Sequence, residues 1–182
     1  MEKKSKILIV AAHPDDEVLG CGASMAKWSN LGHDVNVLIM AEGATSRDNK
    51  RNRKKRAKEL SILSESAKQS AMILGINSIQ LLNYPDNRMD SVDFLEVVKS
   101  VENQIEIFKP NLVLTHHAGD LNIDHRIIHQ AVITACRPIK GHSVKRILSF
   151  EVPSATDWQS PNYGRPFVPN WFEDINDTLS LK

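Results

Sequence analysis

Five apolar runs, separated by stretches with helical periodicity, constrain the fold of this 182-residue chain more than any other feature. The runs predict strands at Lys6 to His13, Asp34 to Glu42, Ile79 to Pro85, Asn111 to His117 and Arg146 to Val152. The first, second and fourth are continuously apolar, which is typical of strands covered on both faces of a parallel sheet. The predicted helices lie between them, at about Asp16 to Leu31, Arg53 to Leu74, Ser91 to Phe108 and Asp124 to Cys136.

This β-α-β-α alternation predicts an α/β fold, a three-layer sandwich with a mostly parallel, Rossmann-like sheet and right-handed crossovers. Gly32 and Gly75 follow two of the helices and suit their C-termini. The length suits one domain over residues 1–182. From Pro153 onward the chain is rich in proline and aromatic residues, which predicts an ordered loop over the sheet edge. A last helix with Asp177 as N-cap begins and stops within about one turn, so we expect the domain to lack a C-terminal helix.

Charge and composition exclude several classes of protein. The net charge of +1 gives no reason to expect nucleic acid or an anionic membrane as partner, and no apolar stretch approaches the roughly 20 residues of a membrane span. The basic run from Arg47 to Leu60 predicts a solvated loop or helix start, with a phosphate-bearing ligand as the alternative. Cys21 and Cys136 form no disulfide framework, which favours a cytoplasmic protein.

The first polar cluster, "HPDDE", stands where the first predicted strand ends and a helix begins, with His13, Asp15, Asp16 and Glu17. Carboxylates at a helix start can simply cap amides and favour the helix dipole, but that role does not require the histidine. Imidazole nitrogen and carboxylate oxygen are normal zinc ligands, and catalytic zinc sites use three protein ligands. Neighbouring aspartates on a helix point about 100° apart, so one can hold a metal while the other faces an attacking water.

The second cluster, "THHAGDLNIDHRIIHQA", follows the fourth predicted strand. His125 and His129 are spaced i, i+4 and share one helix face, and Asp124 can cap the helix or hold a ligating histidine by a hydrogen bond. Ligands in an open α/β sheet bind beyond the carboxyl ends of the strands, where both clusters lie. We therefore expect His125, at least, to be a metal ligand.

Together, "AHPDDE" and "THHAGDLNIDH" resemble the two signatures of the PIG-L/LmbE-like N-acetylglucosaminyl deacetylases, and the similar layout runs from about Lys6 to the C-terminus. Members of this family are metal-dependent hydrolases that remove acetyl groups from amino sugars. The resemblance implies an LmbE-like fold, metal ligation by His13, Asp16 and His125, and Asp15 as general base. Zinc is the expected metal, and iron(II) or other divalent ions are alternatives for a His₂Asp site.

Two further residues are predicted to bind substrate. Arg47, in "GATSR", stands where the family tends to place a substrate-binding arginine. Asp86 lies in a loop at the carboxyl end of the sheet, where it can meet sugar hydroxyls. The alternative for both residues is an ordinary polar surface loop.

Asn122 marks a departure from the family pattern. The second motif often has the form H-x-D-H, in which the first histidine assists at the oxyanion, but this chain has "NIDH". The asparagine amide can donate a hydrogen bond to the oxyanion but cannot titrate, so Asn122 is predicted to be a neutral catalytic donor. Alternatively, Asn122 caps the helix, and the acid is one of His116, His117 and His129.

The sequence therefore predicts a zinc-dependent N-deacetylase acting on an N-acetylglucosamine-type amino sugar or its conjugate. The alternatives are an amidase on another glycoside-linked amide, a non-catalytic sugar- or metal-binding domain, and a nucleotide-binding protein. The nucleotide-binding alternative loses its main support because Met25 occupies the third glycine position after Gly20 and Gly22. We expect an amino-sugar substrate, free or conjugated, no nucleic acid and no transmembrane segment, and a homo-oligomer is compatible with the chain.

Overall fold

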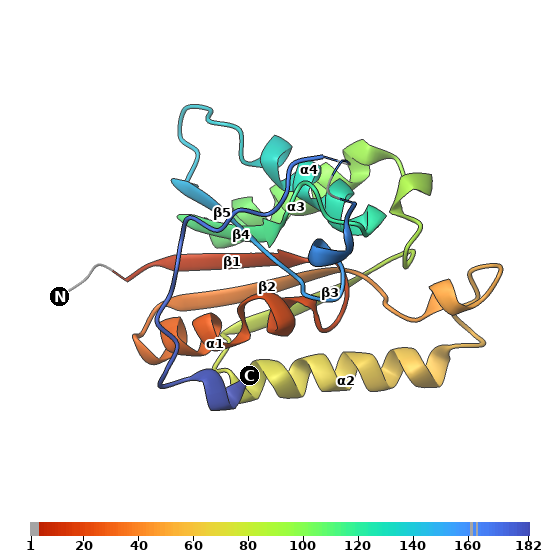
Figure 1. The fold of residues 1–182 in the computed structure, drawn as a ribbon, viewed down its shortest axis with the longest axis horizontal. Coiled ribbons are helices and arrows are strands. Elements are labelled where there is room, and N and C mark those ends of the chain that lie inside the picture. The colour runs from red at the N-terminus through yellow and green to blue at the C-terminus, as the bar shows by residue number, and fades with distance from the viewer. Residues whose placement is uncertain (1–3, 161, 163) are drawn as a thin grey trace.

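The computed structural model describes residues 4–160, 162 and 164–182, which form a three-layer α/β sandwich (Figure 1). Its sheet has five parallel strands in the order β3-β2-β1-β4-β5. The strands are β1 (Lys6–Ala11), β2 (Asp34–Ala41), β3 (Ser78–Tyr84), β4 (Leu112–His116) and β5 (Arg146–Phe150). The helices are α1 (Asp16–Asn30), α2 (Ala57–Ile73), α3 (Phe94–Phe108) and α4 (Ile123–Ala135). The predicted fold class is confirmed.

The continuous apolarity of β1 follows from its place in the middle of the sheet. Helices α1 and α2 cover one face, and α3 and α4 cover the other (Figure 1). Ile7 and Ile9 pack into the core on the α1 side, whereas Leu8 and Val10 pack into the core beneath α3 and α4. Because successive side chains of a strand point to opposite faces, a strand buried on both faces must be apolar at every position.

Two helices begin later than the sequence predicts. Helix α2 begins at Ala57, because the chain before it is drawn towards the end of β2, where Arg53 Nε lies 2.7 Å from Glu42 Oε2. Helix α3 begins at Phe94, because the Asp93 carboxylate caps it, accepting a hydrogen bond of 2.8 Å from the backbone N–H two residues on. Both differences come from side-chain contacts, an ion pair and a helix cap, which the helical periodicity of the sequence does not reveal.

The tail after β5 crosses from the α4 layer to α1. Its segment 165–173 lines a cavity of about 880 Å³ together with β5, as predicted for a loop over the sheet edge. The Thr178 hydroxyl donates to Ala23 O of α1 at 2.8 Å. The last turn of the described chain is a single 3₁₀ turn, Leu179–Leu181. Its N-cap is Thr178 rather than the predicted Asp177.

The strand order places both polar clusters at one crevice. The chain moves outward from β1 to β2 and β3, then returns to form β4 on the other side of β1. Connections therefore leave β1 and β4 in opposite directions, which opens a crevice beyond their carboxyl ends. The turn after β1 contains His13, and the first turn of α4 contains His125. Among the helices of the described residues, none combines the length and apolarity needed to cross a bilayer.

Candidate active site

The turn between β1 and α1 folds the Asp16 carboxylate back over the end of β1. Backbone Asp16 N–H donates to His13 O at 3.2 Å, and backbone His13 N–H donates to Asp16 Oδ2 at 2.9 Å. Asp16 is only 4% exposed. The turn therefore presents a buried carboxylate and an imidazole, three residues apart, to the same space.

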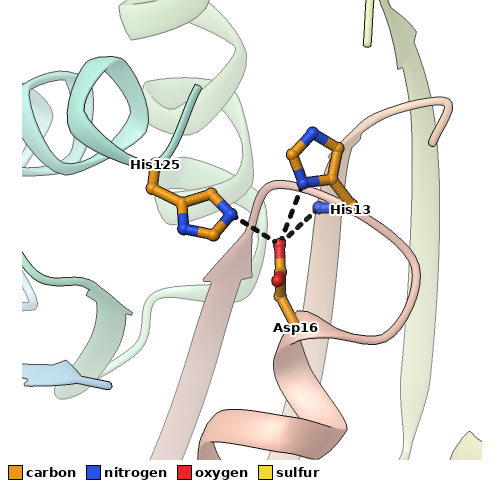
Figure 2. A group of neighbouring side chains, drawn as sticks. All are labelled: His13, Asp16 and His125. Carbon is orange, nitrogen blue, oxygen red and sulfur yellow. Dashed lines mark hydrogen bonds and ion pairs between the residues drawn. The ribbon is translucent and has the colours of Figure 1, made fainter. Parts of the chain in front are cut away.

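Helix α4 brings the third member of the group. Asp16 Oδ2 lies 3.2 Å from His13 Nδ1 and 3.1 Å from His125 Nε2, so the carboxylate oxygen sits between the two imidazoles (Figure 2). One ligand atom from each of the three residues lies within 4.8 Å of the others. The structure thus brings together the three predicted ligands from the turn after β1, the start of α1 and the start of α4.

The far nitrogen of each imidazole faces a carboxylate. His13 Nε2 lies 3.1 Å from Asp124 Oδ2 and 3.4 Å from Asp86 Oδ1. His125 Nδ1 lies 3.1 Å from Asp120 Oδ2. A carboxylate in this position fixes the tautomer and orientation of a metal-ligating histidine and raises its basicity. For Asp124 the sequence offered two roles, a helix cap or a contact to a ligating histidine, and the structure shows the contact to His13. The sequence analysis missed Asp120, whose one signal was an acid in the loop before the His125 helix.

The carboxylates around the two imidazoles favour positive charge at this position. Burial by itself would lower the pKa of His13, but the Asp124 and Asp16 carboxylates raise it to about 10. Burial works against the charge of Asp16, yet the His125 and His13 imidazoles hold its pKa well below the ordinary value. A divalent cation would supply positive charge at the same place. One carboxylate oxygen and two imidazole nitrogens are a set of ligand atoms that suits such a cation.

Asp15 and Glu17 flank the buried Asp16. Asp15 is exposed and has a φ of 151°, an unusual conformation for a residue other than glycine, and its N–H donates to Glu17 Oε2 at 3.1 Å. The protein around the carboxyl group of Asp15, together with the charge of Asp16, raises its pKa to about 6. Burial raises the pKa of Glu17 to about 7. Glu17 thus holds the backbone N–H of Asp15 at the start of α1.

Asn122 occupies the N-cap of α4. Its Oδ1 accepts a hydrogen bond from Asp124 N–H at 2.9 Å, and its Nδ2 donates to Asn87 Oδ1 at 2.9 Å. The capping role that the sequence offered as an alternative is therefore present. Catalytic donation by Asn122 stays a prediction.

Each of the three histidines proposed as alternative acids has a contact of its own, and His116 also stacks on His125 with ring centroids 3.8 Å apart. His116 is fully buried, its Nε2 accepts the Ala12 N–H at 2.8 Å, and burial lowers its pKa to about 3, so it is neutral near pH 7. His129 Nδ1 lies 2.8 Å from the backbone oxygen of His116. His117 Nε2 lies 3.0 Å from Arg165 O in the tail.

The two predicted substrate contacts lie in different surroundings. Arg47 is exposed and forms a 3.1 Å ion pair with Glu59 of α2, so the structure does not bring it into the His/Asp cluster. Asp86 is buried beside His13 rather than on a surface loop, and it accepts hydrogen bonds from Ser46 N–H and the Asn87 amide. Substrate binding by Arg47 and Asp86 stays a prediction.

Comparison with known proteins is consistent with this geometry. The family model "PIG-L: GlcNAc-PI de-N-acetylase" matches residues 8–136. The uncharacterised deacetylase YaiS of Escherichia coli is 31% identical, over 96% of this chain and 84% of its own length. Diacetylchitobiose deacetylase of Thermococcus kodakarensis is 28% identical, over 97% of this chain and 66% of its own.

The architecture is also that of a solved structure. The N,N'-diacetylchitobiose deacetylase of Pyrococcus horikoshii superposes with a TM-score of 0.75, covering 99% of this chain and 67% of the other. Sequence identity in that superposition is 22%, so the similarity establishes a shared fold.

Proposed function

The chain belongs to the PIG-L (GlcNAc-PI de-N-acetylase) family, and from this premise we propose that it removes the N-acetyl group from an N-acetylglucosamine-type amino sugar or its conjugate. The observation that carries the proposal is the Asp16 oxygen lying between His13 and His125, with a further carboxylate on the far nitrogen of each imidazole. A carboxylate on the far nitrogen is what fixes the orientation of metal-ligating histidines, and this supports the proposal.

We propose that His13 Nδ1, Asp16 Oδ2 and His125 Nε2 hold one divalent ion, with zinc as the expected metal. Two imidazoles and one carboxylate are a common catalytic zinc set, and iron(II) accepts the same donors. When bound, such an ion polarises an amide carbonyl and makes a water molecule easier to deprotonate.

Asp15 is the proposed general base. It is adjacent to the proposed ligand Asp16, is exposed, and has a raised pKa, which makes its carboxylate a better proton acceptor than an ordinary aspartate. Asp15 takes a proton from water as the water oxygen bonds to the amide carbon. The same proton then passes to the nitrogen as the carbon–nitrogen bond breaks, giving acetate and a free amino sugar.

Asn122 is the proposed neutral donor to the developing oxyanion. One hydrogen of the Asn122 amide is donated to Asn87 Oδ1. Among the residues that the structure describes, the second hydrogen has no acceptor, so it can be donated to the substrate. With neutral His116 buried and the other two histidines engaged elsewhere, Asp15 is the group that handles both proton transfers.

The test measures metal and amine release together. Purified protein is analysed for metal, and amine release is followed over N-acetylglucosamine, N,N'-diacetylchitobiose and conjugated N-acetyl sugars. We expect one ion per chain, loss of most metal and activity in His125→Ala, and a rate lowered by about 10² to 10⁴ in Asp15→Asn with metal retained.

His33→Ala and Asp177→Asn are the matched controls. His33 lies before β2, at the opposite end of that strand from the site, and Asp177 is exposed near the chain end. Full metal retention by His125→Ala would overturn the ligand assignment. Metal binding with no amine release from any N-acetyl sugar would favour a binding domain or an amidase on another glycoside.

A further inference from the structure

A carboxylate behind the proposed ligand His125 is itself held by the tail of the chain. Asp120 Oδ2 lies 3.1 Å from His125 Nδ1 and also accepts a hydrogen bond of 2.8 Å from the Thr156 hydroxyl. Its other oxygen accepts the Asn122 N–H at 2.8 Å. Asp120 is completely buried and Thr156 is 7% exposed, so solvent has little access to this contact.

The direction of the Thr156 hydroxyl is fixed by a second hydrogen bond. Its oxygen accepts the Val152 N–H at 2.8 Å, and a hydroxyl has a single hydrogen to donate. That hydrogen is therefore committed to Asp120. The Gln159 amide adds a contact of 3.3 Å to the backbone oxygen of Asp120, so two residues of one tail segment hold the same aspartate.

The orientation of the Asp120 carboxylate matters because the carboxylate contacts Nδ1 of His125, while the opposite ring nitrogen, Nε2, is the proposed metal ligand. With Asp120 Oδ2 3.1 Å from Nδ1, the other ring nitrogen, Nε2, faces Asp16 and the proposed metal position. A carboxylate beside Nδ1 favours the tautomer of a metal-bound histidine in which Nε2 is the ligand atom. Without the Thr156 hydroxyl, Oδ2 loses its one hydrogen bond from the tail, and the Asn122 N–H on Oδ1 is left to orient the carboxylate.

We propose that Thr156 is a positioning residue: through Asp120 it fixes the His125 imidazole, and the tail after β5 thereby sets the metal affinity of the site. This inference rests on the proposed function to the extent that His125 is a ligand. The competing explanation is that the Thr156 hydroxyl only anchors the tail to the domain.

The test compares zinc affinities of apoprotein variants by competition with a chelator of known affinity. Thr156→Val preserves shape but removes the hydroxyl, and we expect zinc affinity to fall by about 3- to 10-fold, the scale of one hydrogen bond. Thr156→Ser keeps the hydroxyl and should bind zinc with the affinity of the wild type. Circular dichroism confirms folding, and Thr156→Ala replaces the valine variant if the latter does not fold.

Thr178→Val is the matched control. Thr178 is buried, lies in the same tail and also donates its hydroxyl to another element, but its partner is Ala23 O of α1. We expect its zinc affinity to equal that of the wild type. An equal loss in both valine variants would assign the effect to a loosened tail and overturn the proposal.

A double-mutant cycle tests the route through Asp120. Asp120→Asn should itself weaken zinc binding by about 10- to 100-fold, and Thr156→Val should add little in that background. Additive losses, or unchanged affinity in Thr156→Val alone, would contradict the positioning role. Failure of wild-type protein to bind zinc or another divalent ion would instead contradict the proposed function.

Discussion

At the residue scale, one oxygen atom organises the site. Asp16 Oδ2 accepts the His13 N–H, which closes the turn after β1, and the same atom lies between the His13 and His125 imidazoles. A carboxylate oxygen can serve several partners because it has more than one lone pair. The turn geometry and the proposed metal geometry are therefore coupled, and a change at Asp16 disturbs both.

Asn122 gives a prediction that separates capping from catalysis. Asn122→Ser retains an oxygen that can cap α4 but removes the amide hydrogens, whereas Asn122→Ala removes both. We expect the alanine variant to lose about 1 kcal/mol of unfolding free energy and the serine variant to lose less. We expect both to lower kcat, by up to about 3 kcal/mol in activation free energy, as one lost oxyanion donor does.

Chemical denaturation gives the unfolding free energy, and steady-state kinetics on the same preparations give kcat. Wild-type turnover in Asn122→Ser would mean that the residue is a cap alone, and that the donor to the oxyanion lies elsewhere.

At the element scale, the connection between β2 and α2 is shaped by ion pairs rather than by secondary structure. Glu42 accepts hydrogen bonds from Arg51 at 2.8 and 2.9 Å and from the Thr45 hydroxyl at 2.6 Å. Further along, Asp48 lies 2.7 Å from Arg56 Nε. These contacts hold a strongly basic segment over the carboxyl end of β2, close to Asp86, which accepts the Ser46 N–H.

The Glu42 contacts make this segment sensitive to acid. Burial would raise the pKa of Glu42, but Arg51 and Thr45 lower it below its ordinary value. A group whose pKa is lower in the folded state stabilises that state above its unfolded pKa, about 4.3 for glutamate, and loses this effect as the pH falls through the folded value. We therefore expect segment 45–56 to loosen in acid, and to loosen at pH 7 in Glu42→Gln.

Hydrogen exchange of amides 45–56, corrected for intrinsic rates, measures the loosening. Glu106→Gln, on the exposed side of α3, is the control and should leave exchange unchanged. Equal protection in wild type and Glu42→Gln at pH 7 would show that the ion pairs do not order this segment.

At the scale of the whole molecule, the proposed metal joins the two helical layers. Two of its proposed ligands come from the starts of α1 and α4, helices that lie on opposite sides of the sheet (Figure 1). The third, His13, lies in the turn between β1 and α1. An ion bound to such a set stabilises the folded state by mass action, because the unfolded chain does not hold the three ligands together.

Metal removal should therefore lower the melting temperature. At zinc about 1,000-fold above its Kd the stabilisation is about 4 kcal/mol, and a chain of this size shifts by about 2–4 °C per kcal/mol, which gives a shift of about 8–16 °C. Calorimetry with and without chelator measures it. His125→Ala should melt at the same temperature in both conditions, and an equally unresponsive wild type would contradict the metal site.

The fold class and the two polar clusters could be predicted from the sequence alone. Runs such as "KILIV" are apolar at every position because β1 is covered on both faces, and that requirement is local enough to be visible in one segment. The parallel order brings the carboxyl ends of β1 and β4 together, which places both motifs at one crevice. The grouping of His13, Asp16 and His125 itself came from the resemblance of the two motifs to those of the family, and the structure places the three side chains together.

The side chains that support these residues could be identified only from the folded chain. Asp120 behind His125, Asp86 beside His13, and Thr156 on Asp120 come from three different loops. Such pairings form only where two elements approach each other to within a few tenths of an ångström of hydrogen-bond distance. Sequence periodicity reports only which face of one element is buried. For the same reason the sequence could not place Arg47 on Glu59 of α2, because that contact depends on where the basic segment ends and α2 begins.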